Sequence, residues 1–590
     1  MKNFFSYLFA SLTAILLAIV IFVLIIAGII GAAISSGDEP VTIKPNTILK
    51  IDLTQPIAER STDNPFDKIS PFGAGESALG LTTIIENIKK AKTDKNIKGI
   101  YLNITDVMAG SASMEEIRNA LLDFKKSKKF IISYSDMYSQ AAYYLSSVAD
   151  SVFIQPTGMI MHVGLSSQVM FFKDFLEKWG VKPIVIRHGK FKAAVEPFLD
   201  NKMSEANKEQ VASYMGAIWN VMLKGISESR KISIDHLNFL ADSLKVVNPK
   251  TALEHKFIDK LLYEDQVMDR LKALAKLKET DKIKFVSISD YSKAEAEEEE
   301  DEENSKKQYV AVIYASGEIV TGEGDEQIIG STTIAEAISK ARKDKKVKAI
   351  VLRVNSPGGS ALASDIIWRE IVLARKDKPV IASMGDVAAS GGYYISCAAD
   401  TIVASASTIT GSIGVFGLLF NAQELVNNKI GIQTETVKTN TYADAMSPLK
   451  EMTEFERMTI QAEVEGIYDV FISHVADGRG MSKADVDSIG QGRVWAGQDA
   501  LRIGLVDVLG GLDVAIEIAA EKAKLKKYDI KEYPAKKDFM QKLMEEFSVK
   551  MESRLVEKNL GAAAGYYQYL NSLSKMQGVQ ARLPYFYINN

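Results

Sequence analysis

The chain has 590 residues, of which 47% are hydrophobic and 25% are charged, with 71 basic and 75 acidic residues and a net charge of −4. A globular composition at this length predicts two or three domains with full-sized cores. The balance of charge leaves no broad basic field, which argues against nucleic acid as a partner. The single cysteine, Cys397, excludes an intramolecular disulfide framework and a four-cysteine metal site, and we expect neither a metal nor a cofactor.

The N-terminus contains a long uncharged segment. No charged residue occurs from Phe4 to Ala33, and at about 1.5 Å of rise per residue a helix of this length more than spans a hydrocarbon core of roughly 30 Å. The segment therefore predicts a transmembrane anchor at 4–33. Lys2 precedes it and acidic residues follow it, which places a cytoplasmic tip at 1–3 and the rest of the chain on the far side. A cleaved secretory signal, with GAAISS near the cleavage point, is the competing interpretation.

Beyond this segment the chain repeats itself. The stretch TTIIENIKKAKTDKNIKGI from Thr82 returns as TTIAEAISKARKDKKVKAI from Thr332, a separation of 250 residues (332 − 82). In each copy, amphipathic helical patterns alternate with short apolar strands, which is typical of a parallel α/β sheet covered by helices. An acidic run lies between the copies, and the end of the chain has a charged helical pattern. The predicted parts are a first copy at 41–288, an acidic linker at 289–308, a second copy at 309–529 and a helical tail at 530–590.

Two motifs of the second copy suggest acyl-transfer chemistry. In VNSPGGSA, a strand runs into Gly358 and Gly359 before a helix, and a glycine turn of this kind can direct backbone N–H groups at an oxyanion. An ordinary tight turn is the alternative. In AASGGYY, Ser390 follows a strand and precedes a helical run, which suits an exposed nucleophile. The alternative role for this serine is a helix N-cap.

A serine nucleophile needs a base, and histidine is a poor candidate here. The chain has five histidines, and the second copy contains one, His474, in a helical run far from the glycine turns. A lysine can serve instead if burial lowers its pKa from about 10.4 into the working range. Lys192, in the less polar run KFKAAVEPF of the first copy, fits best; Lys190 is its nearest rival. A surface lysine at the start of a helix is the alternative interpretation of Lys192.

The copies have diverged in complementary ways. The first copy has Gln140 where the second has Ser390, and the second has Tyr442 where the first has Lys192. If the hydroxyl comes from one copy and the amine from the other, neither copy needs both. The pattern predicts one active site divided between two docked halves.

Together these motifs resemble the signal peptide peptidase A family in its long, duplicated form, a group of membrane-anchored bacterial serine proteases related in fold to ClpP and the crotonases. The resemblance rests on KFKAAVEPF in the first copy and on NSPGG, GDVAASGGYYIS, TGSIGVFG and GRVWAGQDALRIGLVD in the second. It implies two tandem ClpP/crotonase-like domains, Ser390 as nucleophile and Lys192 as general base. It also implies that Ser412 orients the lysine and that N–H groups around Gly358 and Gly359 form the oxyanion hole.

The resemblance further implies a setting and a substrate. It predicts degradation of cleaved signal peptides and of other apolar or unfolded peptides, by a homotetramer held in a bacterial inner membrane with its catalytic part in the periplasm. Two alternatives stay open at this point. One is a crotonase-type acyl-CoA enzyme, which shares the fold but needs no serine, and the other is a non-catalytic membrane scaffold.

Overall fold

The computed structural model describes residues 7, 9–18, 20–21, 41–61, 78–294, 307–535, 579–583 and 587–589. Residues 9–18, inside the predicted anchor, are helical, and within these ranges no helix is both long and apolar enough to cross a membrane. Residues 4–6, 8, 19 and 22–33 of the predicted anchor, the predicted tip at 1–3 and residues 295–306 of the predicted acidic linker lie outside the described ranges.

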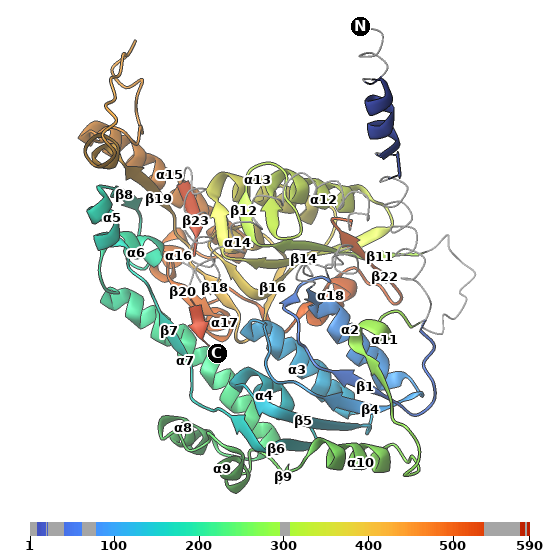
Figure 1. The fold of residues 1–590 in the computed structure, drawn as a ribbon. Helices are drawn as coiled ribbons and strands as arrows, with labels where there is room; N and C mark the ends of the chain where they lie inside the picture. The colour runs from blue at the N-terminus through green and yellow to red at the C-terminus, as the bar shows by residue number, and fades with distance from the viewer. Residues whose placement is uncertain are drawn as a thin grey trace.

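The first copy is built on a six-stranded parallel sheet (Figure 1). Its inner strands are continuous apolar runs because both faces of a parallel sheet are covered. Ile48, Ile100 and Ile131, for example, are fully buried. In spatial order the strands are β10 (Lys284–Ser287), β1 (Thr47–Ile51), β4 (Ile97–Leu102), β5 (Phe130–Tyr138), β6 (Ser151–Ile160) and β9 (Lys260–Leu261).

The second copy repeats this order. Its strands run β22 (Asp529–Tyr533), β11 (Tyr309–Ser316), β14 (Val347–Ser356), β16 (Val380–Ala389), β17 (Thr401–Ala404) and β21 (Val508–Leu509), and β16 also pairs with β18 (Ile409–Gly411), which pairs with β20 (Val494–Ala496). The matching strand orders confirm the predicted duplication and the α/β class.

The helices repeat in the same way. α2 (Leu81–Thr93) and α12 (Ser331–Lys343) carry the duplicated sequence, and each buries one apolar stripe, such as Ile84, Ile88 and Ala91 in α2. Six more pairs of helices occupy corresponding places in the two copies. They are α3 (Ser111–Lys125) and α13 (Ala361–Arg375), α4 (Gln140–Ser146) and α14 (Gly391–Ser396), α7 (Glu205–Arg230) and α15 (Glu454–Arg479), α8 (Ile234–Asp242) and α16 (Lys483–Ile489), α9 (Pro249–Glu254) and α17 (Gly497–Arg502), and α10 (Glu264–Leu274) and α18 (Leu512–Lys522).

A further sheet joins the two copies. It contains β8 (Lys182–Arg187) of the first copy and four strands of the second, β12 (Glu318–Val320), β13 (Ile328–Gly330), β15 (Gly358–Ser360) and β19 (Phe416–Asn421). Its remaining strand, β23 (Val579–Arg582), comes from the C-terminal tail and lies between β15 and β19. Where the structure describes the predicted helical tail, at β22, β23 and β24 (Tyr587–Asn589), it is extended, because each segment pairs with an existing strand. Its helical pattern at 536–578 lies outside the described ranges.

A buried ion cluster stabilises the interface between the two copies. Arg353 of β14 is fully buried and binds Glu59 and Glu116 of the first copy, each at 2.7 Å. The remaining carboxylate oxygens accept hydrogen bonds from the Asn355 side chain at 3.0 Å and the Leu512 N–H at 3.0 Å. Since a buried charge is costly unless it is paired and hydrogen-bonded, this cluster fixes how the copies dock.

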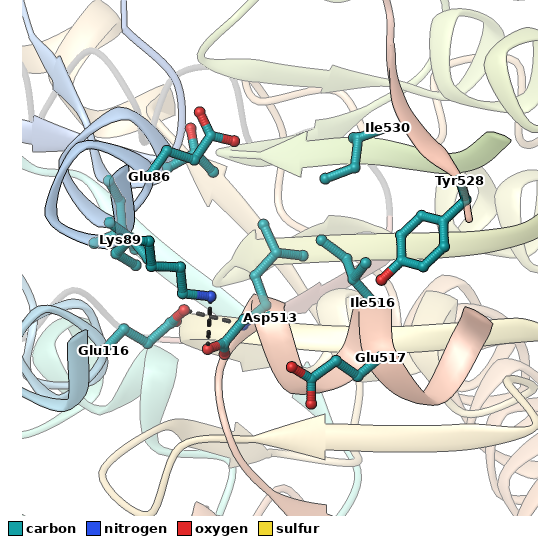
Figure 2. A pocket seen from close by; sticks show the side chains of 12 residues that line it. Glu86, Lys89, Glu116, Asp513, Ile516, Glu517, Tyr528 and Ile530 are labelled. Atoms are coloured by element: carbon teal, nitrogen blue, oxygen red, sulfur yellow. Dashed lines mark hydrogen bonds and ion pairs between the residues drawn. The ribbon is translucent and has the colours of Figure 1, made fainter. Parts of the chain in front are cut away.

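A cavity of about 240 Å³ lies beside this cluster, between α2 and α18 (Figure 2). Its wall is mainly apolar, with Leu81, Ile85 and Ile516 among the lining residues, and Lys89 pairs with Asp513 at 3.2 Å. None of the predicted catalytic residues lines it. The cavity therefore belongs to the contact between the copies.

Removing Arg353 from the ion cluster should destabilise the contact between the two copies. We expect Arg353→Ala to lower the free energy of unfolding by about 3–5 kcal/mol, because it leaves two carboxylates buried without their cation. Thermal unfolding followed by circular dichroism measures the change.

Lys182→Ala is the matched control. It removes a pair with Glu451 at 3.3 Å whose side chains are 61% and 78% exposed, so its effect should be about 0–1 kcal/mol. Equal melting temperatures for the two variants would contradict the role given to Arg353.

Candidate active site

Ser390 lies at the sharp turn between β16 and α14. Its backbone has φ +55° and ψ −112°, which is a strained conformation for a residue with a side chain. Its N–H donates to the Gly411 carbonyl at 2.8 Å, which helps to hold the turn. The hydroxyl makes no capping bond to the helix and instead contacts the Gly414 carbonyl at 3.3 Å. The N-cap interpretation is therefore wrong, and the hydroxyl is available for chemistry.

The Lys192 amine meets this hydroxyl. Nζ lies 2.7 Å from Ser390 Oγ, 3.1 Å from Ser412 Oγ and 3.3 Å from the Ser412 carbonyl. The side chain is 1% exposed, and its hydrogen-bond partners within the described residues are serine oxygens rather than carboxylates. Burial holds the pKa of Lys192 well below its ordinary value of 10.5, because the charged form loses its hydration. The surface interpretation of Lys192 is wrong, whereas its rival, Lys190, is exposed.

His474 and Tyr442, which the sequence comparison also named, form no hydrogen bond with this pair. His474 is paired with Asp365 at 3.1 Å and stacked on Trp368. Tyr442, the second-copy counterpart of Lys192, is 45% exposed. Within the described ranges, no histidine forms a hydrogen bond with Ser390 or Lys192.

The lysine reaches the serine because two chain segments pass unusually close. Gly492 has φ +82°, and a Cβ atom there would lie 2.7 Å from Lys192 Cα. Its N–H donates to the Ile413 carbonyl at 2.7 Å, and the carbonyl of the next residue, Arg493, accepts from the Ser412 N–H at 2.6 Å. The first two residues of the GRVWAG segment therefore pack against the Lys192 backbone, through Gly492, and hydrogen-bond to Ile413 and Ser412.

Gln210 is a residue that the sequence reasoning missed. It lies on α7, is 1% exposed, donates to the Phe191 carbonyl at 3.1 Å and accepts from the Val494 N–H at 3.2 Å. One side chain of the first copy thus ties the residue before Lys192 to the second copy. No local motif surrounds it, so only the assembled structure reveals it.

The glycine turn faces the start of α14. Gly358 has φ +99°, and a Cβ atom there would lie 2.8 Å from the Gly391 nitrogen and 2.1 Å from the Ala581 carbonyl oxygen of β23. The Gly358 N–H donates to Ser356 Oγ at 3.1 Å, while Gly359 pairs with Ala581 in the sheet. The structure thus brings Gly358, Gly359 and Ser390 together, and it adds Gly391, the residue after the serine, which the sequence reasoning had not named.

The chain is similar in sequence to known proteases. Residues 123–278 and 373–526, one region in each copy, match peptidase family S49. The chain is 38% identical over 500 residues to Protease 4 of Salmonella typhi, covering 82% of this chain and 79% of that protein. It is 36% identical over 458 residues to Serine protease SPPA, chloroplastic, of Arabidopsis thaliana, covering 76% and 66%. Among solved structures, a ClpP1 mutant from Listeria monocytogenes covers 35% of this chain and 94% of its own, with 14% identity and a TM-score of 0.24.

The duplicated family match confirms the resemblance stated from the sequence, and the matching sheets of the two copies confirm a fold of two tandem α/β domains. The domain bounds and the roles of individual site residues are not decided by these comparisons and stay predictions.

The pH dependence of activity should follow Lys192. Its neutral form is the base, so kcat/KM should rise with pH as the amine loses its proton, and the midpoint should lie well below 10.5 because burial lowers the pKa. A pH–rate profile on a peptide substrate without titratable groups measures this. A rising limb centred at 10.5 or above would contradict the assignment.

Gly492→Ala should disable the site. The added Cβ collides with Lys192 Cα and moves the amine away from Ser390, so we expect kcat to fall by about 100-fold or more. Gly466→Ala is the matched control, because a Cβ there meets nothing within 4 Å. Equal kcat values for the folded fractions of the two variants would contradict the placement of Gly492.

Proposed function

We propose a mechanism and a substrate class for this chain, which belongs to peptidase family S49 and is a serine protease. Ser390 is the nucleophile and Lys192 the general base. The observation that carries the proposal is the 2.7 Å contact between Lys192 Nζ and Ser390 Oγ in a site where both side chains are at most 1% exposed. Burial without a carboxylate partner favours an uncharged amine, and only an uncharged amine can accept the serine proton.

The reaction begins when neutral Lys192 takes the proton from Ser390 Oγ. The oxygen attacks a peptide carbonyl, and the resulting oxyanion is stabilised by N–H groups around Gly358, Gly359 and Gly391. Protonated Lys192 then delivers its proton to the leaving amine. Water, activated by the same lysine, hydrolyses the acyl-enzyme. Ser412 keeps Nζ aimed at Ser390 through its hydroxyl contact at 3.1 Å.

The proposed substrates are cleaved signal peptides and other apolar or unfolded peptides. This rests on the resemblance to signal peptide peptidase A and on the uncharged N-terminal run at 4–33, which suits an enzyme held beside membrane-embedded peptides. On the same ground we propose a single-pass anchor in a bacterial inner membrane, a catalytic part in the periplasm and a homotetramer.

The two alternatives are weaker. A non-catalytic scaffold gives no reason to bury a lysine amine against a serine hydroxyl in a strained turn. An acyl-CoA enzyme of the crotonase type would need neither group, and the family match is to a peptidase.

Replacing the paired residues tests the proposal. We expect Ser390→Ala and Lys192→Ala each to lower kcat on a fluorogenic apolar peptide by at least about 1000-fold, because nucleophile and base act as one unit. Lys190→Ala is the matched control; its amine is exposed and contacts the Phe191 ring, so activity should stay within about twofold. Activity that survives Ser390→Ala would overturn the assignment.

A further inference from the structure

The segment that carries Lys192 lies against the second copy. Residues 188–192, here called the lysine loop, follow β8 and end at the base itself. The first residue of the loop, His188, donates its backbone N–H to the Val415 carbonyl at 3.4 Å. Gly189 has φ +89°, and a Cβ atom there would lie 2.6 Å from Gln491 Cα. The lysine loop therefore contacts the second copy from its first residues onward.

The His188 ring lies between two carboxylates of the second copy. Nδ1 lies 2.6 Å from Glu465 Oε2 on α15, and Nε2 lies 4.0 Å from Asp487 Oδ1 on α16. The ring stacks on Tyr468 of α15, with ring centroids 3.8 Å apart. Tyr468 is 3% exposed, so the imidazole rests on a buried side chain. One residue of the first copy thus joins the lysine loop to two helices of the second.

Hydrogen bonds lead from Tyr468 to the residue before the base. The Tyr468 hydroxyl donates to Asp487 Oδ1 at 2.6 Å and accepts from the Gln491 N–H at 3.2 Å. The Gln491 side chain donates to Asp487 Oδ2 at 3.3 Å, and the Gln491 backbone carbonyl accepts from the Phe191 N–H at 3.0 Å. The groups that support the imidazole ring therefore also hold the backbone next to the base.

His188 has no direct bond to the reacting groups. Lys192 Nζ lies against Ser390 and Ser412, and among the residues that the structure describes His188 forms no hydrogen bond with any of these three. Its effect on the reaction can therefore be exerted only through the lysine loop. Holding a catalytic group in its reactive geometry is itself worth a large factor in rate.

We infer that His188 is a positioning residue for the general base. The inference rests on the proposed function of Lys192. The bond to Glu465 and the stacking on Tyr468 hold the lysine loop against the second copy, and this contact keeps water away from the Lys192 amine. Since burial is what keeps the pKa of Lys192 below 10.5, loosening the loop lets that pKa rise.

A pH–rate profile separates positioning from general stability. His188→Leu in the full chain keeps an apolar side chain on Tyr468 and removes the bond to Glu465. We expect the midpoint of the rising limb of kcat/KM to move upward by at least about half a pH unit, which is about a threefold loss on that limb. The shift is moderate because the pair is partly exposed. A loss of folded protein alone would lower kcat/KM equally at every pH and leave the midpoint in place.

Two further variants test the pair itself. His188→Asn keeps a side-chain N–H that can occupy the place of Nδ1, so its midpoint should lie nearer to that of the wild type than the midpoint of His188→Leu does. Glu465→Leu leaves the lysine loop unaltered and should move the midpoint in the same direction as His188→Leu, which keeps the test valid if His188→Leu does not fold. The double variant should shift the midpoint no further than the larger single shift, because both changes remove one interaction.

Lys483→Ala is the matched control. Lys483 of α16 pairs with Asp469 of α15, so this pair joins the same two helices without including a residue of the lysine loop. Its midpoint should equal that of the wild type. An unchanged midpoint in both His188→Leu and Glu465→Leu, or an equal shift in Lys483→Ala, would overturn the inference; with Ser390→Ala inactive, the proposed function would still stand. Activity that survives Ser390→Ala would overturn both.

Discussion

The structure depends on keeping one lysine amine away from water. Lys192 is 1% exposed and meets serine oxygens, with no carboxylate among its described partners to offset the loss of hydration. A charged ammonium group in this setting is costly, so burial favours the neutral form. That burial cannot be achieved by the first copy alone, since the atoms around Nζ belong to Ser390 and Ser412 of the second. Docking of the two copies therefore buries Lys192 and favours its neutral form, which is the form that can act as a base.

The docking is fixed by groups that have no part in the chemistry. Arg353 of the second copy is fully buried between Glu59 and Glu116 of the first, and Gln210 ties the Phe191 carbonyl to the Val494 N–H. Such contacts hold their partners in one geometry because leaving any of them unpaired in a buried interface is costly. Gly492 then lets the two backbones approach more closely than a side chain would permit. A buried dyad at 2.7 Å results from these constraints.

The duplicated fold and the pair Ser390 and Lys192 could be predicted from the sequence. The features that could not be predicted depend on contacts between residues far apart in the chain. The repeat at Thr82 and Thr332 predicted two copies. The small number of histidines, and the fact that each copy lacks one of the two groups, indicated Ser390 and Lys192 as the catalytic pair. These features are short motifs or repeats at a fixed spacing, which can be recognised in the sequence alone. Gln210 carries neither kind of signal, since its two backbone partners come from different copies.

The tail was harder still to predict. Strand β23 has four residues, too few for a period to show, and its partners β15 and β19 precede it by more than 150 residues in the chain. Its conformation is set by the two edges that it joins rather than by its own composition. The charged helical pattern of the sequence predicted a helical tail and did not indicate that part of the tail pairs with β15 and β19.

One chain supplies both halves of the catalytic pair, Lys192 from the first copy and Ser390 from the second. Mixing or co-expressing the Ser390→Ala and Lys192→Ala variants tests it directly, because each variant retains the group that the other lacks. We predict that the mixture cleaves a fluorogenic apolar peptide no faster than either variant alone, since Lys192 and Ser390 meet within a single chain. Restored activity in the mixture would show that amine and hydroxyl come from different chains, and would contradict the account.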